Sequence, residues 1–178
     1  MDGLACSSSP ADSTAWEPFR ATETSGPADD FVALLRWARR GEERGELLFA
    51  AMAETAANAQ QREALKLLTE LERMVGGRLD GLVAQHDAAA PLSPEQRAAT
   101  VELGRDLVQG GWGSFLELFP AETTKALDRY ARLRRVADDP DLPELVLLTV
   151  HEQALADFAA LQLGGDHDGA LAIIRQVL

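Results

Sequence analysis

The chain has 178 residues, of which 46% are hydrophobic and 26% are charged, with a formal net charge of −12 at pH 7. This hydrophobic content excludes general disorder, and the length suits one domain with a sizeable core. The negative average field repels a phosphate backbone, so no nucleic-acid partner is expected. The longest apolar runs are short and broken by charge, so no membrane partner is expected either.

The first 27 residues are small and polar, with no sustained helical period. They predict a flexible tail at 1–27 in front of a helical bundle domain at 28–178. The single cysteine, Cys6, lies in this tail, which excludes an internal disulfide. It follows Leu4 and Ala5 as in a lipoprotein cleavage site. Only five residues precede it, without a charged start or an apolar stretch, so we expect no signal peptide and a cytoplasmic location.

From Asp29 onward, apolar residues recur at steps of three and four, which is the period of an α-helix. Asn58 with Gln61 forms a capping pair, and Ser93 with Gln96 forms a capping box. Pro120 is expected either to kink its helix or to begin the main part of it. No alternating run predicts a strand, so the expected fold class is all-α. The predicted helices cover about 29–57, 59–86, 94–109, 114–137 and 144–163, and a last short helix includes 170–178.

Glutamates interrupt the apolar stripes of these helices. Glu42, Glu72 and Glu152 each stand where a leucine is expected. A polar group on a buried face costs about 2–7 kcal/mol without a partner, and a charge costs more. Each of the three carboxylates must therefore be compensated.

The spacing of the glutamates points to an internal repeat. Thirty residues separate Glu42 from Glu72, and thirty separate Glu122 from Glu152. The pattern Leu-Leu-Thr-x-x-Glu that ends at Glu72 recurs at Glu152. Two similar helical hairpins follow, each with one inward glutamate per helix, and the helix at 94–109 would cross between them. The match is short, so a duplication and a chance match in leucine-rich helices both stay open.

Two such hairpins resemble the ferritin-like superfamily of rubrerythrins and di-iron carboxylate proteins, whose bundles bind two metal ions between the helices. The resemblance covers about residues 29–163. It implies a four-helix ferritin-like bundle of two helical hairpins, with a helical crossover and a short C-terminal fifth helix. It also implies four glutamate ligands for iron or manganese: Glu42, Glu72, Glu122 and Glu152.

The match to the family's metal motif is partial. Phe49 stands seven residues after Glu42, where tyrosine is usual in the family. The second and fourth helices of the family carry Glu-x-x-His, but the two histidine positions hold Val75 and Leu155 here. His151, next to Glu152, is a further nitrogen donor, although one residue turns it about 100° around the helix. Tyr130 is a candidate redox or hydrogen-bonding group.

Two classes of function follow, and whether the chain is an enzyme stays open. A metalloprotein would handle dioxygen, peroxide or a small substrate with iron or manganese. In the alternative no metal is bound, and the carboxylates pair with Arg78, Arg105, Arg129 or His151. The metal-free bundle would then be an interaction or assembly module, or a small-molecule pocket near Trp112, Phe115 and Phe119. The missing histidines favour this alternative. A homodimer through the last helix is predicted from its terminal apolar residues, Ile173, Ile174, Val177 and Leu178.

Overall fold

The computed structural model describes residues 30–178, which fold into helices with no strand among them. The all-α prediction is confirmed for this part of the chain, and the predicted tail with Cys6 lies outside it. The elements are α2 (Phe31–Thr55), α3 (Ala59–Gln85), α4 (Pro94–Gly110), α5 (Trp112–Leu116), α6 (Phe119–Val136), the 3-10 turn η2 (Asp139–Asp141), α7 (Leu142–Leu163) and α8 (His167–Val177).

Local capping signals fix where the main helices begin. The Asn58 side chain accepts a hydrogen bond from the Gln61 amide at the start of α3. Ser93 and Gln96 make the predicted reciprocal capping box at the start of α4. The predicted helix at 114–137 is divided into α5 and α6, and Pro120 lies in the first turn of α6. Pro120 therefore begins a helix, because its missing amide hydrogen costs nothing there.

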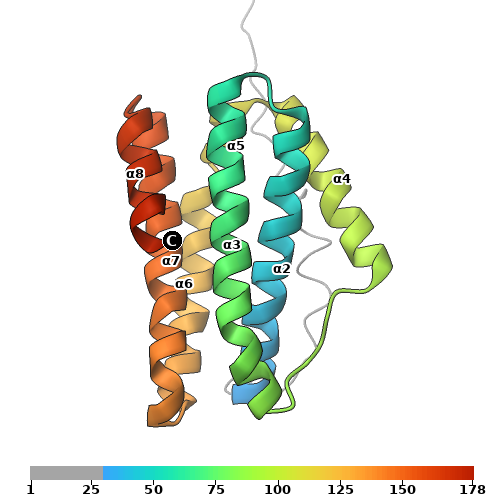
Figure 1. Ribbon diagram of the computed structural model, residues 1–178, viewed down its shortest axis with the longest axis vertical. Coiled ribbons are helices and arrows are strands. Elements are labelled where there is room, and N and C mark those ends of the chain that lie inside the picture. The colour runs from blue at the N-terminus through green and yellow to red at the C-terminus, as the bar shows by residue number, and fades with distance from the viewer. Residues whose placement is uncertain (1–29) are drawn as a thin grey trace, which may run out of the picture.

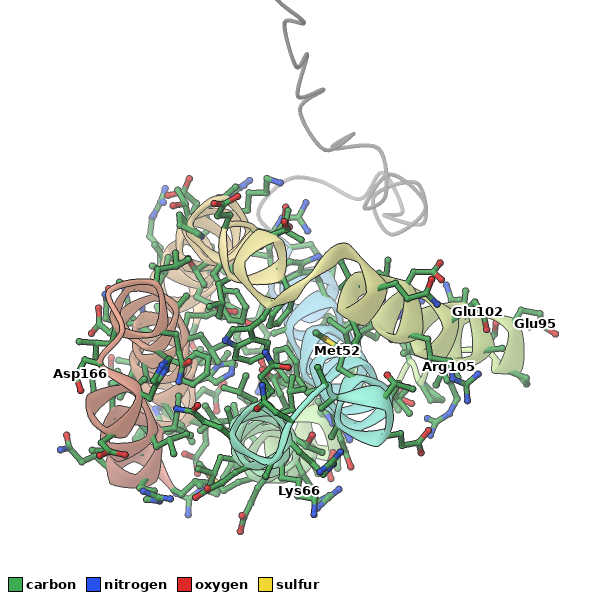
Figure 2. All side chains as sticks on the ribbon, turned by 90° about the horizontal axis from the view of Figure 1, so that it is seen from above. Met52, Lys66, Glu95, Glu102, Arg105 and Asp166 are labelled. Carbon is green, nitrogen blue, oxygen red and sulfur yellow. The ribbon has the colours of Figure 1, made fainter. Side chains whose placement is uncertain are left out.

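Four long helices surround the core (Figure 1). A short turn joins α2 to α3, and η2 joins α6 to α7, so each pair forms a helical hairpin. Helix α2 also contacts α6, and α3 contacts α7. Seen along the bundle, Met52 points inward while Lys66 and Asp166 point away from the core (Figure 2). Leu35, Leu68 and the other residues of the apolar stripes fill the centre.

Helix α4 lies outside the four-helix core and packs along α2. The side chains of Arg97 and Glu43 form an ion pair between the two helices. Gly104 lets the helices approach closely, because a Cβ atom at this position would lie 2.7 Å from the Leu48 carbonyl oxygen. This close packing holds one side of α4 over the middle of α2, where a pocket opens.

The last helix, α8, packs against α7 and α3. Ile174, which was predicted to form part of a dimer surface, is fully buried within the chain. Ile173 and Val177 pack partly against the same core, whereas Leu178 is exposed. Most of the apolar side of α8 is thus used inside the bundle, and the homodimer stays a prediction. No helix between residues 30 and 178 has the length and apolar character needed to cross a membrane.

Candidate metal centre

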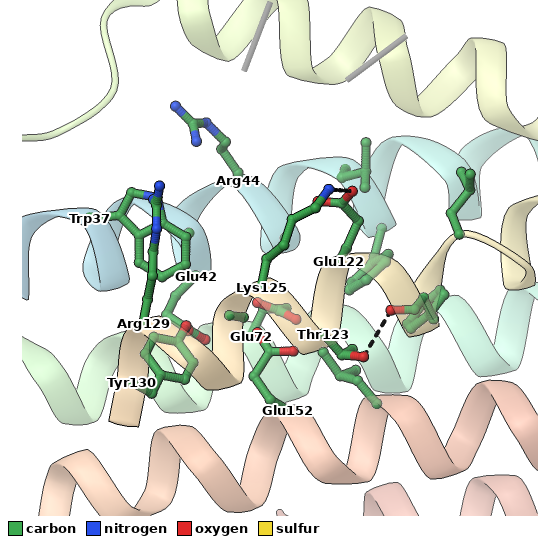
Figure 3. Close-up of a pocket in the computed structure, with 18 of the residues that line it drawn as sticks. Trp37, Glu42, Arg44, Glu72, Glu122, Thr123, Lys125, Arg129, Tyr130 and Glu152 are labelled. Atoms are coloured by element: carbon green, nitrogen blue, oxygen red, sulfur yellow. Dashed lines mark hydrogen bonds and ion pairs between the residues drawn. The ribbon is translucent and has the colours of Figure 1, made fainter. Parts of the chain in front are cut away.

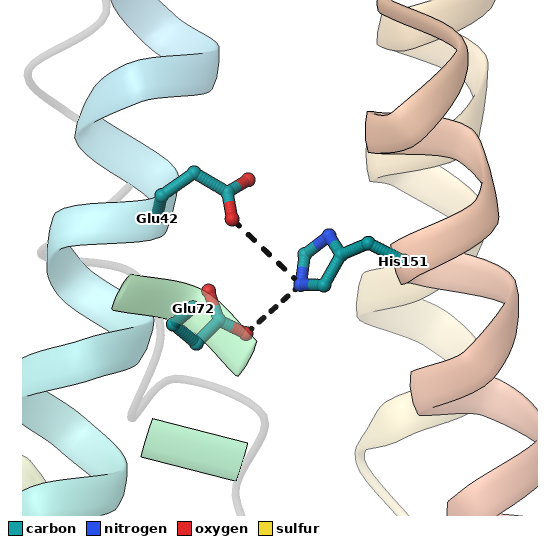
Figure 4. A group of neighbouring side chains, drawn as sticks. All are labelled: Glu42, Glu72 and His151. Atoms are coloured by element: carbon teal, nitrogen blue, oxygen red, sulfur yellow. Dashed lines mark hydrogen bonds and ion pairs between the residues drawn. The ribbon is translucent and has the colours of Figure 1, made fainter. Parts of the chain in front are cut away.

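Three polar side chains from three helices meet in the core of the bundle. Glu42 comes from the middle of α2, Glu72 from the middle of α3 and His151 from α7 (Figure 4). Their exposed fractions are 2%, 4% and 1%. The two glutamates are buried because they continue the apolar stripes of their helices, as the period of three and four requires.

The imidazole of His151 lies between the two carboxylates. Its Nε2 atom is 3.2 Å from Oε1 of Glu72 and 3.7 Å from Oε2 of Glu42. One ligand atom from each residue can be chosen so that all three lie within 4.8 Å of one another. A single cation placed among these atoms could bind all three residues.

Two more buried groups adjoin this trio. The Tyr130 hydroxyl on α6 donates a hydrogen bond to Oε1 of Glu42 over 3.1 Å. Glu152 follows His151 on α7, is only 9% exposed, and interacts electrostatically with both other glutamates. These five residues form the candidate metal centre, called the metal centre below: Glu42, Glu72, Tyr130, His151 and Glu152. All four core helices contribute to it.

Glycines on the facing helices make room for the carboxylates. A Cβ atom at Gly45 of α2 would lie 2.9 Å from Cγ of Glu72 and closer still to its carboxyl group. A Cβ atom at Gly76 of α3 would lie 3.2 Å from Cβ of Glu42. Each glutamate therefore lies against a glycine of the other helix. Glycine in a helix interior costs about 1 kcal/mol relative to alanine, and here it admits the side chain from across the interface.

Burial makes the carboxylates of the centre weak acids. Desolvation is the main cause that raises the pKa of Glu42, Glu72 and Glu152 from 4.5 to about 8. The charge of His151 opposes the rise at Glu42 and Glu152, but the neighbouring carboxylates add to it. Burial also raises the pKa of Tyr130 well above 10.0, so its hydroxyl stays protonated at neutral pH. Without a metal cation, the glutamates hold protons up to about neutral pH.

The donor atoms of the centre suit a transition metal. Oε2 of Glu42 is buried without a hydrogen-bond partner among residues 30–178, and a cation beside it would compensate this oxygen. Carboxylate oxygens combined with an imidazole nitrogen match the ligand preferences of iron and manganese. The second ring nitrogen of His151, Nδ1, has no hydrogen-bond partner in the described part of the chain, so no hydrogen bond from this atom fixes the orientation of the ring. Metal-binding histidines usually donate from this second nitrogen.

A pocket of about 580 Å³ leads from the surface to the metal centre (Figure 3). Glu42, Glu72, Glu152 and Tyr130 all contribute to its lining. Apolar side chains of α2, α4, α5 and α6 form its walls, among them Leu48, Phe49, Leu103, Phe115 and Phe119. Small molecules therefore have a route to the three buried glutamates.

Glu122 does not join the buried group. It also lines the pocket, but its side chain is 36% exposed and pairs with Lys125 over 2.6 Å. Figure 3 shows it turned away from the three buried glutamates. The buried stripe of α6 includes Phe119, Thr123, Ala126 and Tyr130, and Glu122 lies one residue, about 100°, away from Thr123 around the helix. Thr123, the next residue, is buried instead.

The structure also locates the other residues considered from the sequence. Val75 and Leu155, at the family's histidine positions, are buried in the apolar core. Arg78 pairs with Glu144, and Arg105 lies near Glu54 and Glu102. Arg129 lies over the Trp37 ring, 4.4 Å from its centroid. Sequence reasoning did not find the hydrogen bond between Tyr130 and Glu42, because residues 88 positions apart carry no local signal of contact.

Comparisons with protein-family models, with curated proteins and with solved structures give no match for this chain. Its function therefore has to be inferred from the residues of the metal centre and of the pocket.

Proposed function

We propose that the protein is a metalloprotein that binds iron or manganese through Glu42, Glu72, His151 and Glu152 and acts on dioxygen, peroxide or a small substrate. The observation that carries the proposal is the burial of two carboxylates beside one imidazole, where Oε2 of Glu42 has no hydrogen-bond partner in the described chain; the third buried carboxylate, Glu152, adjoins them. An apolar core of the same shape would not need these groups, and a divalent cation would compensate their charge.

A ferritin-like arrangement of the helices is part of this proposal. Two helical hairpins supply the ligands, and α4 crosses between them on the outside of the bundle. The ligand set departs from that family, because His151 stands beside Glu152 instead of three residues after it. We infer that one imidazole, shared between Glu42 and Glu72, replaces the two histidines of the family pattern.

The number of ions depends on Glu122. Glu42, Glu72, His151 and Glu152 offer enough donors for one ion. A second ion would need Glu122 to leave Lys125 and turn into the pocket. We therefore propose one ion bound by the four buried residues, with a second site conditional on that rotation.

Iron or manganese in this centre would supply redox chemistry or Lewis acidity toward a molecule that enters the pocket. Tyr130 fixes one oxygen of Glu42 by its hydrogen bond, which leaves the other oxygen directed toward His151. Tyr130 also contributes to the lining of the pocket. The rings of Phe49 and Phe119 stack along the pocket and give its wall an apolar surface.

Metal content tests the proposal. The full chain is purified without chelator, its iron, manganese and zinc are measured by mass spectrometry, and Mn²⁺ is titrated into metal-free protein by calorimetry. Glu72→Gln keeps the size of the side chain but removes a charged ligand. We therefore expect Mn²⁺ affinity to fall by about tenfold to a hundredfold. Glu122→Gln is the matched control and should retain the affinity. Absence of stoichiometric binding, or equal losses in both variants, would overturn the metalloprotein proposal.

A metal-free function remains the second candidate, and one observation favours it. His151 lies within 3.7 Å of both glutamates, so the three buried polar side chains have partners in one another. The centre would then be a buried polar network under a small-molecule pocket. The same titration separates the two candidates, since this one predicts no saturable Mn²⁺ binding.

A further inference from the structure

The pocket that leads to the metal centre combines apolar walls with a small group of buried polar side chains at its inner end. We propose that this pocket binds an uncharged alcohol with an apolar body, whose hydroxyl group lies at the metal centre and whose body lies against the phenylalanine rings. The alcohol as the substrate class of a metal-dependent reaction rests on the proposed function. Its binding and its orientation do not.

The walls provide a surface for the apolar body. Phe115 and Phe119 meet edge to face with their ring centroids 5.1 Å apart, and Phe49 stacks on Phe119 at 6.3 Å. Leu48 and Leu103 also line the pocket. A volume of about 580 Å³ lies within the range of small-molecule sites, which are mostly apolar with a few polar groups. An aliphatic chain would bury its surface here by the hydrophobic effect.

The charged side chains of the pocket do not favour an ionic ligand. Lys125 forms an ion pair with Glu122 at 2.6 Å, and Arg129 lies over the Trp37 ring. Arg44 also has a partner within the chain. The lining as a whole holds five acidic and four basic side chains, so neither sign dominates. An ionic ligand would give up its hydration without a compensating excess of opposite charge.

A hydroxyl group suits the inner end of the pocket. Oε2 of Glu42, a residue that lines the pocket, is buried without a hydrogen-bond partner among residues 30–178. A hydroxyl can donate a hydrogen bond to such an oxygen, and its own lone pairs stay available for another donor or for a metal ion. The carboxylates would repel an anionic group, whereas an ammonium group would meet Glu42 and Glu72 where both face His151. The hydroxyl therefore fits the centre with and without a metal ion.

Probes that share one hydrocarbon chain test the charge preference. The ligands 1-octanol, octylamine and octanoate are titrated into the metal-free full chain by calorimetry. We expect 1-octanol to bind at least about tenfold more tightly than either ion, because the burial of a charged group costs far more than the burial of a hydroxyl. Equal affinities for the three probes, or the tightest binding by octylamine or octanoate, would overturn the proposal.

The orientation of the alcohol can be read from Tyr130, which is the only tyrosine of the chain and contacts Glu42. Phe119 lies about three helical turns before it on α6, so the two rings mark different parts of the pocket. In nuclear Overhauser spectra of metal-free protein, the octanol protons next to the hydroxyl should approach the Tyr130 ring, and the terminal methyl protons should approach Phe119. The reverse pattern would refute the inward hydroxyl.

Gly41 offers a way to fill the pocket without disturbing the fold. It lines the pocket, and a Cβ atom there would meet nothing within 4 Å. Gly41→Leu should therefore fold and reduce 1-octanol binding at least about tenfold, since the new side chain occupies apolar space that the ligand needs. Gly77→Leu is the matched control, because Gly77 also has open space but lies outside this pocket. Unchanged 1-octanol binding by Gly41→Leu would show that the ligand binds elsewhere.

The outcomes for metal and for alcohol are separable. Octanol binding by a protein that takes up no Mn²⁺ would sink the metalloprotein proposal and leave the alcohol pocket standing. Mn²⁺ binding without octanol binding would refute the alcohol pocket and leave the metal centre standing. Where both bind, Mn²⁺ should relax the protons next to the hydroxyl faster than the terminal methyl protons. Equal relaxation would refute the alcohol as the substrate class of the metal centre.

Discussion

Replacement of Gly45 by alanine should separate the stability of the fold from the affinity of the metal centre. A Cβ atom at Gly45 would lie 2.9 Å from Cγ of Glu72 and closer still to its carboxyl group. The three nearest atoms to the new methyl group all belong to the Glu72 side chain and none to the backbone of α3. Glu72 can therefore give way by rotating out of the centre, and the helices need not separate.

The expected change in the free energy of unfolding is small. Alanine is about 1 kcal/mol better than glycine in a helix interior, which favours the variant. The displaced Glu72 gives up its contact with His151, and a typical hydrogen bond contributes about 0.5–1.5 kcal/mol. These opposing terms leave the metal-free variant within about 2 kcal/mol of the parent protein. Gly41→Ala, with open space around the new methyl group, should gain up to about 1 kcal/mol.

Metal affinity should respond much more strongly than stability. Displacement of Glu72 removes or misplaces a ligand, and misplaced support around a ligand alone costs about 10–100-fold in affinity. We therefore expect Gly45→Ala to weaken Mn²⁺ binding by at least that factor, while Gly41→Ala binds like the parent. Urea unfolding followed by circular dichroism gives the stabilities, and calorimetry gives the affinities. Parental Mn²⁺ affinity in Gly45→Ala would refute the assignment of Glu72 as a ligand in this position.

Three further predictions concern pH, the buried charges and helix packing. Because burial raises the pKa of the three glutamates from 4.5 to about 8, the folded metal-free chain holds more protons than the unfolded chain between these values. Its free energy of unfolding should fall as pH rises from about 4.5 to about 8. Glu42→Gln should make this dependence on pH less steep, as measured by urea unfolding at several pH values. An unchanged dependence in the variant would argue against the raised pKa of Glu42. Metal must displace the same protons, so Mn²⁺ affinity should rise over this pH range. Glu152→Leu removes a buried carboxyl group from an apolar face. In thermal unfolding the metal-free variant should therefore be as stable as the parent protein or up to about 4 kcal/mol more stable. The same variant should bind Mn²⁺ more weakly. A large loss of stability would instead reveal an essential polar contact of Glu152. Gly104→Ala should destabilise the fold by about 1–3 kcal/mol, because its new Cβ would lie 2.7 Å from the Leu48 carbonyl oxygen, and backbone cannot move aside as a side chain can. Gly81→Ala, in open space, is its control, and equal urea midpoints for the two variants would contradict the close packing of α4 on α2.

Local sequence signals were sufficient for the helices and for three members of the metal centre. Asn58 and Ser93 mark helix starts because a side-chain oxygen that caps a helix bonds amides only two or three residues away. Glu42, Glu72 and Glu152 were found because an apolar stripe with a period of three and four fixes which face is buried. Both kinds of signal act within one helix, so they do not depend on the neighbouring helices.

The composition of the metal centre was decided by how the helices pack against one another. His151 and Glu152 are adjacent and about 100° apart around α7, yet both are buried, because that helix has neighbours on several sides. Glu122 was predicted to face inward, but Thr123 lies on the buried side of α6 and Glu122 pairs with Lys125. The contact of Tyr130 with Glu42 and the fit of Glu72 over Gly45 depend on the distance and rotation between helices. The sequence by itself thus determined the helices and which faces are buried. Only the tertiary structure decided which buried groups meet, because that depends on packing between segments far apart in the chain.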